Sequence, residues 1–115
     1  MNRLLIVDDD KAHLHTVGAV LESRFEVTLV EDAEEALRVI EMLGKIHAVI
    51  SDLDLPGMNG ADLLARVREA NAAVRRILMS GRINTPGFNP ASVQHAEAHV
   101  LLPKPVTVKV LRESV

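Results

Sequence analysis

Five short segments rich in apolar residues alternate along this chain with segments whose apolar residues recur at helical spacing. The five apolar runs lie at residues 4–7, 25–29, 46–50, 77–79 and 100–102. Runs of this length are typical of strands, and continuously apolar runs are typical of strands buried on both faces. The run at 25–29 alternates apolar and polar residues instead, so we expect its strand to lie nearer an edge of the sheet.

Helical stripes separate these runs. Apolar residues follow the spacing of one helical face over 14–21, and residues 33–43 carry a second stripe. The second stripe begins after Asp32 and has Glu35 three residues later, which is a capping-box pattern. Shorter helices are predicted at three further places: 63–71, after Asn89 and after Val106. Strands that alternate with helices predict an α/β fold with three layers, in which a five-stranded parallel sheet is doubly wound, with helices on both faces.

Composition bounds the possible functions. The length of 115 residues favours a single domain, which we place at 1–115. The formal net charge of −3 argues against nucleic acid as a partner of this chain, because binding to phosphates needs a positive field. The chain has no cysteine, which excludes cysteine nucleophiles and thiolate zinc sites. No apolar run approaches the roughly 18 residues of a membrane span, so we expect a cytoplasmic protein that does not bind membranes.

Polar side chains gather where the predicted strands end. The working site of a doubly wound sheet lies beyond the carboxyl ends of its strands. We expect the following side chains to meet there: Asp8, Asp9, Asp52, Asp54, Ser80 and Lys104. Two unit charges about 4 Å apart repel by roughly 4 kcal/mol at an effective dielectric constant near 20, so crowded carboxylates need an offsetting cation. Oxygen ligands suit a hard divalent ion such as Mg²⁺. Phosphoryl transfer to an aspartate needs a carboxylate nucleophile that lies beside a metal ion, a hydroxyl group and an ammonium group.

The motifs at these strand ends resemble those of the receiver domains of two-component response regulators. Four segments carry the resemblance, in this order along the chain: Leu4–Asp9, Asp52–Gly60, Ser80–Gly81 and Lys104–Pro105. The resemblance covers essentially the whole chain and implies a flavodoxin-like sheet with strand order 2-1-3-4-5. It also implies a phosphoacceptor signalling domain of a two-component or phosphorelay system.

The resemblance assigns roles to the four aspartates. Asp52 resembles the phosphoacceptor residue of these domains. The resemblance implies that its phosphoryl group comes from a phosphohistidine on a histidine kinase or a histidine phosphotransfer domain. Asp9 is similar to a direct ligand of Mg²⁺ (or Mn²⁺), and Asp8 to a residue that binds this ion mainly through water. Asp54 is similar to a residue that offers its backbone carbonyl to the ion. The metal ligands implied by the resemblance are therefore Asp8, Asp9, Asp52 and Asp54.

Ser80 and Lys104 complete the implied site. By resemblance, Ser80 binds a phosphoryl oxygen, Lys104 pairs with the phosphoryl group, and the Lys104–Pro105 peptide bond is cis. A domain of this kind catalyses only its own phosphorylation and dephosphorylation. We therefore do not expect an enzyme that turns over a separate substrate.

The chain departs from the family pattern on the face that receivers commonly use for dimerisation or output. Leu101 stands where most members have an aromatic residue, and Val106 replaces a common phenylalanine. We expect intact phosphorylation chemistry with an altered output face. Arg82 and Asp54 occupy positions that border the phosphoryl group in receivers. We hypothesise that these two side chains pair across the site and slow hydrolysis by limiting the entry of water.

Two other functions stay open on the sequence alone. A receiver fold that binds a protein partner without phosphorylation would be consistent with Leu101. A phosphatase of the haloacid-dehalogenase type would use the Asp52-Leu53-Asp54 motif, although that family usually places the motif on its first strand rather than its third. The sequence names neither the kinase, the input signal nor the oligomeric state, and it does not say whether the chain is part of a larger regulator.

Several other polar residues have plainer interpretations. His13 and His15 lie two positions apart and do not face each other on a helix, so we expect both side chains to be exposed to solvent. His95 and His99 have the i, i+4 spacing of a metal pair, but their segment is weakly helical and lacks a third ligand. The two arginines at 75–76 are expected to form a solvated turn before the fourth strand.

Overall fold

A computed structural model describes the whole chain, residues 1–115. Strands and helices alternate along it, which confirms the α/β fold predicted from the apolar runs. In chain order the elements are β1 (Arg3–Val7), α1 (Lys11–Leu21), β2 (Glu26–Val30), α2 (Ala33–Leu43), β3 (Ala48–Asp52), α3 (Gly60–Ala70), β4 (Arg75–Ser80), the 3₁₀-helix η1 (Pro90–Ala96), β5 (Val100–Pro103) and α4 (Val108–Ser114). None of the helices combines the length and apolar character needed to cross a lipid bilayer.

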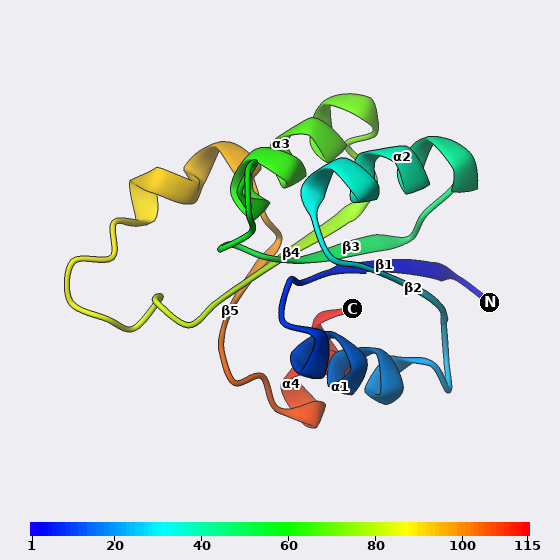
Figure 1. Ribbon diagram of the computed structural model, residues 1–115, viewed down its shortest axis with the longest axis horizontal. Helices are drawn as coiled ribbons and strands as arrows, with labels where there is room; N and C mark the ends of the chain where they lie inside the picture. The colour runs from blue at the N-terminus through cyan, green and yellow to red at the C-terminus, as the bar shows by residue number, and fades with distance from the viewer.

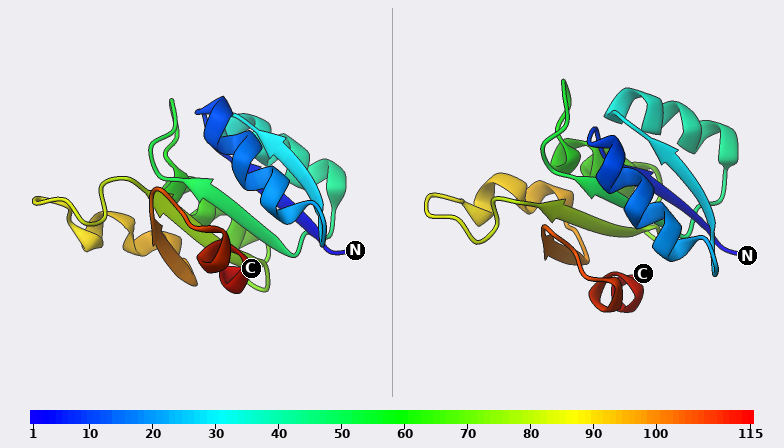
Figure 2. Two further views of the ribbon diagram at one scale, coloured as in Figure 1. Left: turned by 90° about the horizontal axis from the view of Figure 1, so that it is seen from below. Right: turned by 60° about the horizontal axis from the view of Figure 1, so that its bottom comes forward.

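The five strands form one parallel sheet in the order β2-β1-β3-β4-β5. The β2 strand lies at one edge, as its alternating sequence predicts, and β5 lies at the other. Helices α2 and α3 and the η1 segment cover one face of the sheet, and α1 and α4 cover the other (Figure 1). Figure 2 shows α1 and α4 on their common face from two further directions. The doubly wound fold and its flavodoxin-like strand order are both confirmed.

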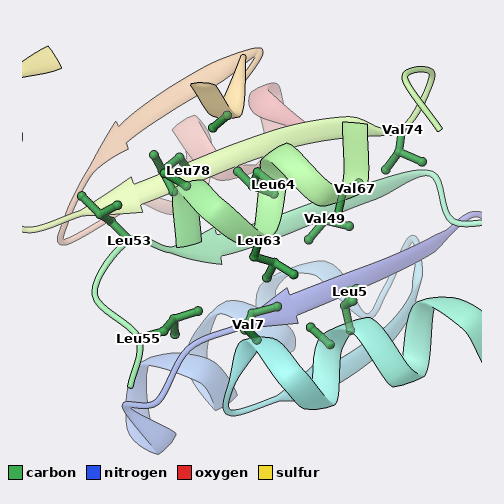
Figure 3. Close-up of a cluster of buried hydrophobic side chains, with 14 of the residues drawn as sticks. Leu5, Val7, Val49, Leu53, Leu55, Leu63, Leu64, Val67, Val74 and Leu78 are labelled. Carbon is green, nitrogen blue, oxygen red and sulfur yellow. The ribbon is translucent and has the colours of Figure 1, made fainter. Parts of the chain in front are cut away.

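The core has two halves because each strand sends alternate side chains to opposite faces of the sheet. Leu5 and Val7 pack with α2 and α3 in a cluster of 17 buried residues, part of which Figure 3 shows. Leu4 and Ile6 pack with α1 and α4 in a cluster of 11 buried residues. All four side chains of this strand are fully buried. Burial of each such side chain contributes about 1.5–3 kcal/mol, which explains why the first apolar run is continuous rather than alternating.

Polar side chains fix where the helices begin. Each helix is preceded by a capping residue whose side chain accepts a hydrogen bond from a backbone N–H of the first turn: Asp10, Asp32, Asn59, Asn89 and Thr107. Such a cap contributes about 1 kcal/mol. The caps at Asp32 and Asn89 agree with the sequence prediction. The cap at Asp10 starts α1 immediately beyond β1, so the acidic residues that follow this strand stay at the edge of the sheet.

The third strand lies two residues later than its apolar run predicts. It spans Ala48–Asp52 rather than 46–50. Its register pairs Ala48 with Leu4 of β1 and Asp52 with Met79 of β4. Asp52 is therefore the last residue of a central strand. A pattern of apolar residues cannot mark that end, because the residue there is charged.

The predicted solvated turn at 75–76 is wrong. The β4 strand begins at Arg75, and Arg76 is only 5% exposed. The Arg76 guanidinium donates hydrogen bonds of 3.0–3.2 Å to the backbone carbonyls of Ala72, Val74 and Glu97. A charged group can be buried when its donors are satisfied in this way. Arg76 thereby fastens the turn before β4 to the end of η1.

We predict that Arg76→Met lowers the free energy of unfolding by about 2–3 kcal/mol, because three backbone carbonyls lose a charged hydrogen-bond donor. Urea unfolding followed by circular dichroism measures this, since the chain has no Trp or Tyr for fluorescence. Arg66→Met is the matched control, because Arg66 is an exposed arginine of α3. The control should change stability by less than about 0.5 kcal/mol. Equal losses in the two variants would contradict the role given to Arg76.

Candidate functional site

Four neighbouring strands bring polar side chains to one edge of the sheet. Asp8 directly follows β1, Asp52 ends β3, Ser80 ends β4 and Lys104 directly follows β5. Because the strands are parallel, their carboxyl ends meet at the same edge. Asp8 and Ser80 are fully buried there, and Asp52 is 5% exposed. The structure thus brings together four of the six residues that the sequence predicts at this edge: Asp8, Asp52, Ser80 and Lys104.

Lys104 joins the two buried carboxylates. Its Nζ lies 3.1 Å from Asp8 Oδ2 and 3.2 Å from Asp52 Oδ2. Its backbone N–H donates a 3.0 Å hydrogen bond to the carbonyl of Ser80, which fixes the chain after β5 against β4. The Lys104–Pro105 peptide bond is cis, as the resemblance implies. One ammonium group therefore lies between two buried carboxylates that would otherwise repel each other.

The buried charges shift one another's proton affinities. Burial raises the pKa of Asp52, and the Asp8 carboxylate adds to this rise while Lys104 opposes it. Burial acts on Asp8 in the same direction, but hydrogen bonds from the Asp10 N–H, His13 and Lys104 outweigh it and lower the pKa of Asp8. Burial would lower the pKa of Lys104, but the two carboxylates raise it. Asp8 and Lys104 are thus held as an ion pair, and Asp52 is the more basic carboxylate, which favours it as a nucleophile.

Three carboxylates form a cluster that can hold a cation. One oxygen each from Asp8, Asp9 and Asp52 lie within 4.8 Å of one another. Asp9 is the exposed member of the three. The Lys104 ammonium offsets only one of their charges, so the cluster keeps an excess of two negative charges. A donor set made only of oxygen atoms with this excess charge fits a hard divalent ion such as Mg²⁺.

Asp54 is not a member of this cluster, because its side chain pairs with Arg82. Arg82 Nη2 lies 2.7 Å from Asp54 Oδ1, and Nε lies 3.1 Å from Oδ2, which is a two-pronged contact. The predicted pairing is confirmed. Both side chains are more than half exposed, at 57% and 53%. The backbone N–H of Arg82 also donates a 3.0 Å hydrogen bond to Ser80 Oγ, which ties this ion pair to the buried site.

Sequence reasoning missed the part played by Gly60. A Cβ built on Gly60 would lie 2.0 Å from the backbone oxygen of Asp52. The Gly60 N–H also donates a 2.9 Å hydrogen bond to the carbonyl of Leu53. Only glycine allows α3 to begin this close to the end of β3. The signal in the sequence is the Asn59-Gly60 pair, which spacing alone does not distinguish from ordinary turn residues.

The expectation of solvent exposure is wrong for His13. Its Nδ1 lies 2.5 Å from Asp8 Oδ2, and its side chain is 19% exposed. His15 is exposed, as expected. The difference arises because Asp10 caps α1 directly beyond β1 and accepts a hydrogen bond from the backbone N–H of His13. The first turn of the helix therefore brings the His13 ring back against the strand end.

His95 and His99 do not share a site. His95 Nε2 lies 2.6 Å from Asp62 Oδ1 of α3. His99 Nδ1 instead accepts a 2.9 Å hydrogen bond from the backbone N–H of Arg76 in β4. The η1 segment is a 3₁₀-helix that ends at Ala96, so the i, i+4 spacing does not put the two rings on one helical face. These histidines fasten the η1 region to its neighbours.

Comparison with known proteins identifies the family. The sequence model of the response regulator receiver domain matches residues 4–115, and the chain belongs to this family. The two-component response regulator ARR14 of Arabidopsis thaliana is 32% identical over 97% of this chain and 34% of its own length. The DNA-binding response regulator MtrA of Mycolicibacterium smegmatis is 30% identical over 88% of this chain and 44% of its own length. The chain thus spans less than half the length of these two relatives.

Solved structures agree with this assignment. A CheY-like response regulator receiver domain protein from Methanospirillum hungatei JF-1 superimposes with a TM-score of 0.86 at 31% identity, covering 98% of this chain and 89% of that chain. A receiver domain from Clostridium thermocellum gives 0.85 at 25% identity, covering 99% and 90%. The protein is a receiver domain of a two-component response regulator, and its acidic pocket fits a phosphoacceptor. Domains of this family are regulatory, which argues against a phosphatase of the haloacid-dehalogenase type.

We predict that Asp52→Asn stabilises the fold near neutral pH and that this gain disappears in acid. Because the fold raises the pKa of Asp52, its ionised carboxylate costs stability once the pH exceeds the pKa of the unfolded chain. The gain should therefore be absent below about pH 3.5 and grow as the pH rises. Urea midpoints of both proteins across this range measure it. Glu69→Gln, at an exposed position of α3, is the control. A gain that does not change with pH would contradict the explanation.

Proposed function

We propose that this domain accepts a phosphoryl group on Asp52 from a phosphohistidine of a histidine kinase or a histidine phosphotransfer domain, in a reaction that depends on Mg²⁺. The observation that carries the proposal is the Lys104 ammonium between Asp8 and Asp52. It places the buried Asp52 carboxyl group beside a fixed positive charge. A transferred phosphoryl group needs such a charge next to it.

The chain's own residues supply nucleophile and alignment. Asp52 Oδ2 is held by Lys104, which leaves Oδ1 as the oxygen that attacks phosphorus. The bond from this oxygen to phosphorus forms as the bond from phosphorus to the donor imidazole nitrogen breaks, and the electron pair leaves with the imidazole. Lys104 then lies beside the transferred group. The Ser80 hydroxyl, at the end of the neighbouring strand, donates a hydrogen bond to one of its oxygens.

Mg²⁺ (or Mn²⁺), when bound, neutralises charge on the phosphoryl oxygens. Asp8, Asp9 and Asp52 would hold the ion with their carboxylates. Asp54 would offer its backbone carbonyl, which accepts no hydrogen bond within the protein. The support for this ligand set is its chemistry, because these donors are all oxygen atoms around an excess of negative charge.

The proposed donor also bears on partners and location. A phosphohistidine donor implies a protein partner, and because we place this donor in the cytoplasm, we propose the same location for the chain. One relative, MtrA, is by name a DNA-binding regulator. The net charge of −3 on this chain argues that its own contacts are with protein rather than with DNA.

We predict that Mg²⁺ and a small phosphodonor such as acetyl phosphate add one phosphoryl group to the protein. Intact-mass spectrometry detects the adduct. It should be absent without Mg²⁺ and absent in Asp52→Asn, because an amide replaces the nucleophilic carboxylate. Glu69→Gln, which leaves the site untouched, should be modified like the wild type.

If the adduct persists in Asp52→Asn, a residue other than Asp52 is the phosphoacceptor. If neither acetyl phosphate nor a phosphorylated histidine phosphotransfer domain labels the wild type, the phosphorylation-independent binding module becomes the better interpretation. That alternative predicts an intact fold with no covalent change.

We predict that Arg82→Ala shortens the half-life of the phosphorylated protein by about twofold or more. The Arg82–Asp54 contact is exposed and contributes modestly, but its loss opens the edge of the site to attacking water. The decay of the phosphoprotein mass with time gives the half-life. Arg66→Ala is the control for loss of an exposed arginine. An unchanged or longer half-life in Arg82→Ala would contradict the hypothesis that this pair limits hydrolysis.

A further inference from the structure

His13 lies against the carboxylate cluster, and the proposed phosphoryl transfer does not use it. Its ring is 19% exposed and contacts Asp8, whose side chain is fully buried, at 2.5 Å. A carboxylate can only accept, so Nδ1 of His13 is the donor in this contact. The ring comes from the first turn of α1, which follows β1, whereas Lys104 follows β5 at the edge of the sheet.

Hydrogen bonds nearly fill the acceptor capacity of Asp8. Oδ1 accepts the backbone N–H of Asp10 at 3.0 Å. Oδ2 accepts from both His13 Nδ1 and Lys104 Nζ, the latter at 3.1 Å. A carboxylate offers about four lone-pair sites in all, two on each oxygen. A metal ion or a metal-bound water that approaches Oδ2 must therefore compete with a donor already in place.

Displacement of Lys104 from Oδ2 would break more contacts with acidic side chains than displacement of His13. Lys104 also contacts Asp52 at 3.2 Å, so its movement would take a cation away from two buried carboxylates at once. The ring of His13 pairs with Asp8 alone among the acidic side chains, and it is partly exposed. Rotation of the His13 side chain to another rotamer moves the ring toward solvent. His13 is therefore the donor that gives way.

We propose that His13 is a positioning residue that competes with Mg²⁺ for Asp8 Oδ2, so that binding of the ion displaces its ring and the histidine weakens the affinity of the site for Mg²⁺. The inference rests on the Mg²⁺ site proposed above. It deepens that proposal, because His13, a side chain outside the ligand set, then sets the Mg²⁺ concentration that the domain needs.

The test is a Mg²⁺ titration followed by ¹H–¹⁵N NMR at one fixed pH. We expect His13→Ala to bind Mg²⁺ about fivefold more tightly than the wild type, because Oδ2 loses one competitor. His13→Asn keeps an N–H donor near the position of Nδ1 and should bind with an affinity close to that of the wild type. His15→Ala, which removes an exposed histidine two positions on, is the matched control and should bind like the wild type.

A second readout needs no variant. In the wild type, the ring resonances of His13 should shift with the same Mg²⁺ dependence as the amides of the acidic pocket, while those of His15 stay in place. Ring resonances of His13 that stay in place at saturating Mg²⁺ would overturn the inference even if His13→Ala did not fold.

The outcomes separate this inference from the function on which it rests. If Mg²⁺ binds the wild type, and binds His13→Ala equally or more weakly, the proposed competition is overturned. The Mg²⁺ site itself would still stand. Binding that becomes detectable only in His13→Ala would support the competition strongly. No response to Mg²⁺ in the wild type or in any variant would overturn the metal site, and the inference with it.

Discussion

The Lys104 ammonium between two buried carboxylates is the interaction on which the site depends. Its Nζ lies 3.1 Å from Asp8 and 3.2 Å from Asp52. Loss of the Lys104 ammonium would leave both buried carboxylates without a paired cation, and breaking a buried ion pair in this way costs about 3–5 kcal/mol. The strand order makes the contact possible, because β1 and β3 are neighbours and β5 lies one strand beyond β4. Lys104 therefore reaches across the end of β4, the strand that ends at Ser80, to contact Asp52 directly.

Two aspartates in this site have opposite properties although both are buried. Asp8 accepts hydrogen bonds from Asp10, His13 and Lys104, and its pKa is lowered. Asp52 has fewer donors than Asp8 to offset its burial, and its pKa is raised. The surroundings thus favour the ionised form of Asp8 and make Asp52 the more basic carboxylate. We propose that two residues next to this pair adjust its chemistry. His13 competes with the metal ion for Asp8, and Arg82 limits the entry of water.

Much of this arrangement could be predicted from the sequence. The apolar runs and helical stripes predict the sheet because their periods follow directly from strand and helix geometry. The rule that sites lie beyond the carboxyl ends of parallel strands then brings Asp8, Asp52, Ser80 and Lys104 together. The pairing of Arg82 with Asp54 could also be predicted, because the resemblance to receivers implies that both positions border the phosphoryl group.

The residues that escaped prediction are those whose role depends on a tertiary contact. Arg76 was expected at the surface because an arginine is seldom buried, but three backbone carbonyls accept its donors. His13 depends on the angle at which α1 leaves β1, which no periodic pattern encodes. Gly60 depends on how closely α3 approaches the carbonyl of Asp52. In each case, the deciding quantity is a distance between elements rather than a feature of one element.

The central claim is that Asp52 and Lys104 together receive a phosphoryl group. The most direct measurement is a ¹H–¹⁵N NMR spectrum in the presence of Mg²⁺ and beryllofluoride, a non-covalent analogue of a phosphoryl group on a carboxylate. We predict shifts at the amides around Asp52, Ser80 and Lys104 that require both reagents and are lost in Asp52→Asn. A spectrum that does not respond, or that responds equally without the Asp52 carboxylate, would contradict the claim.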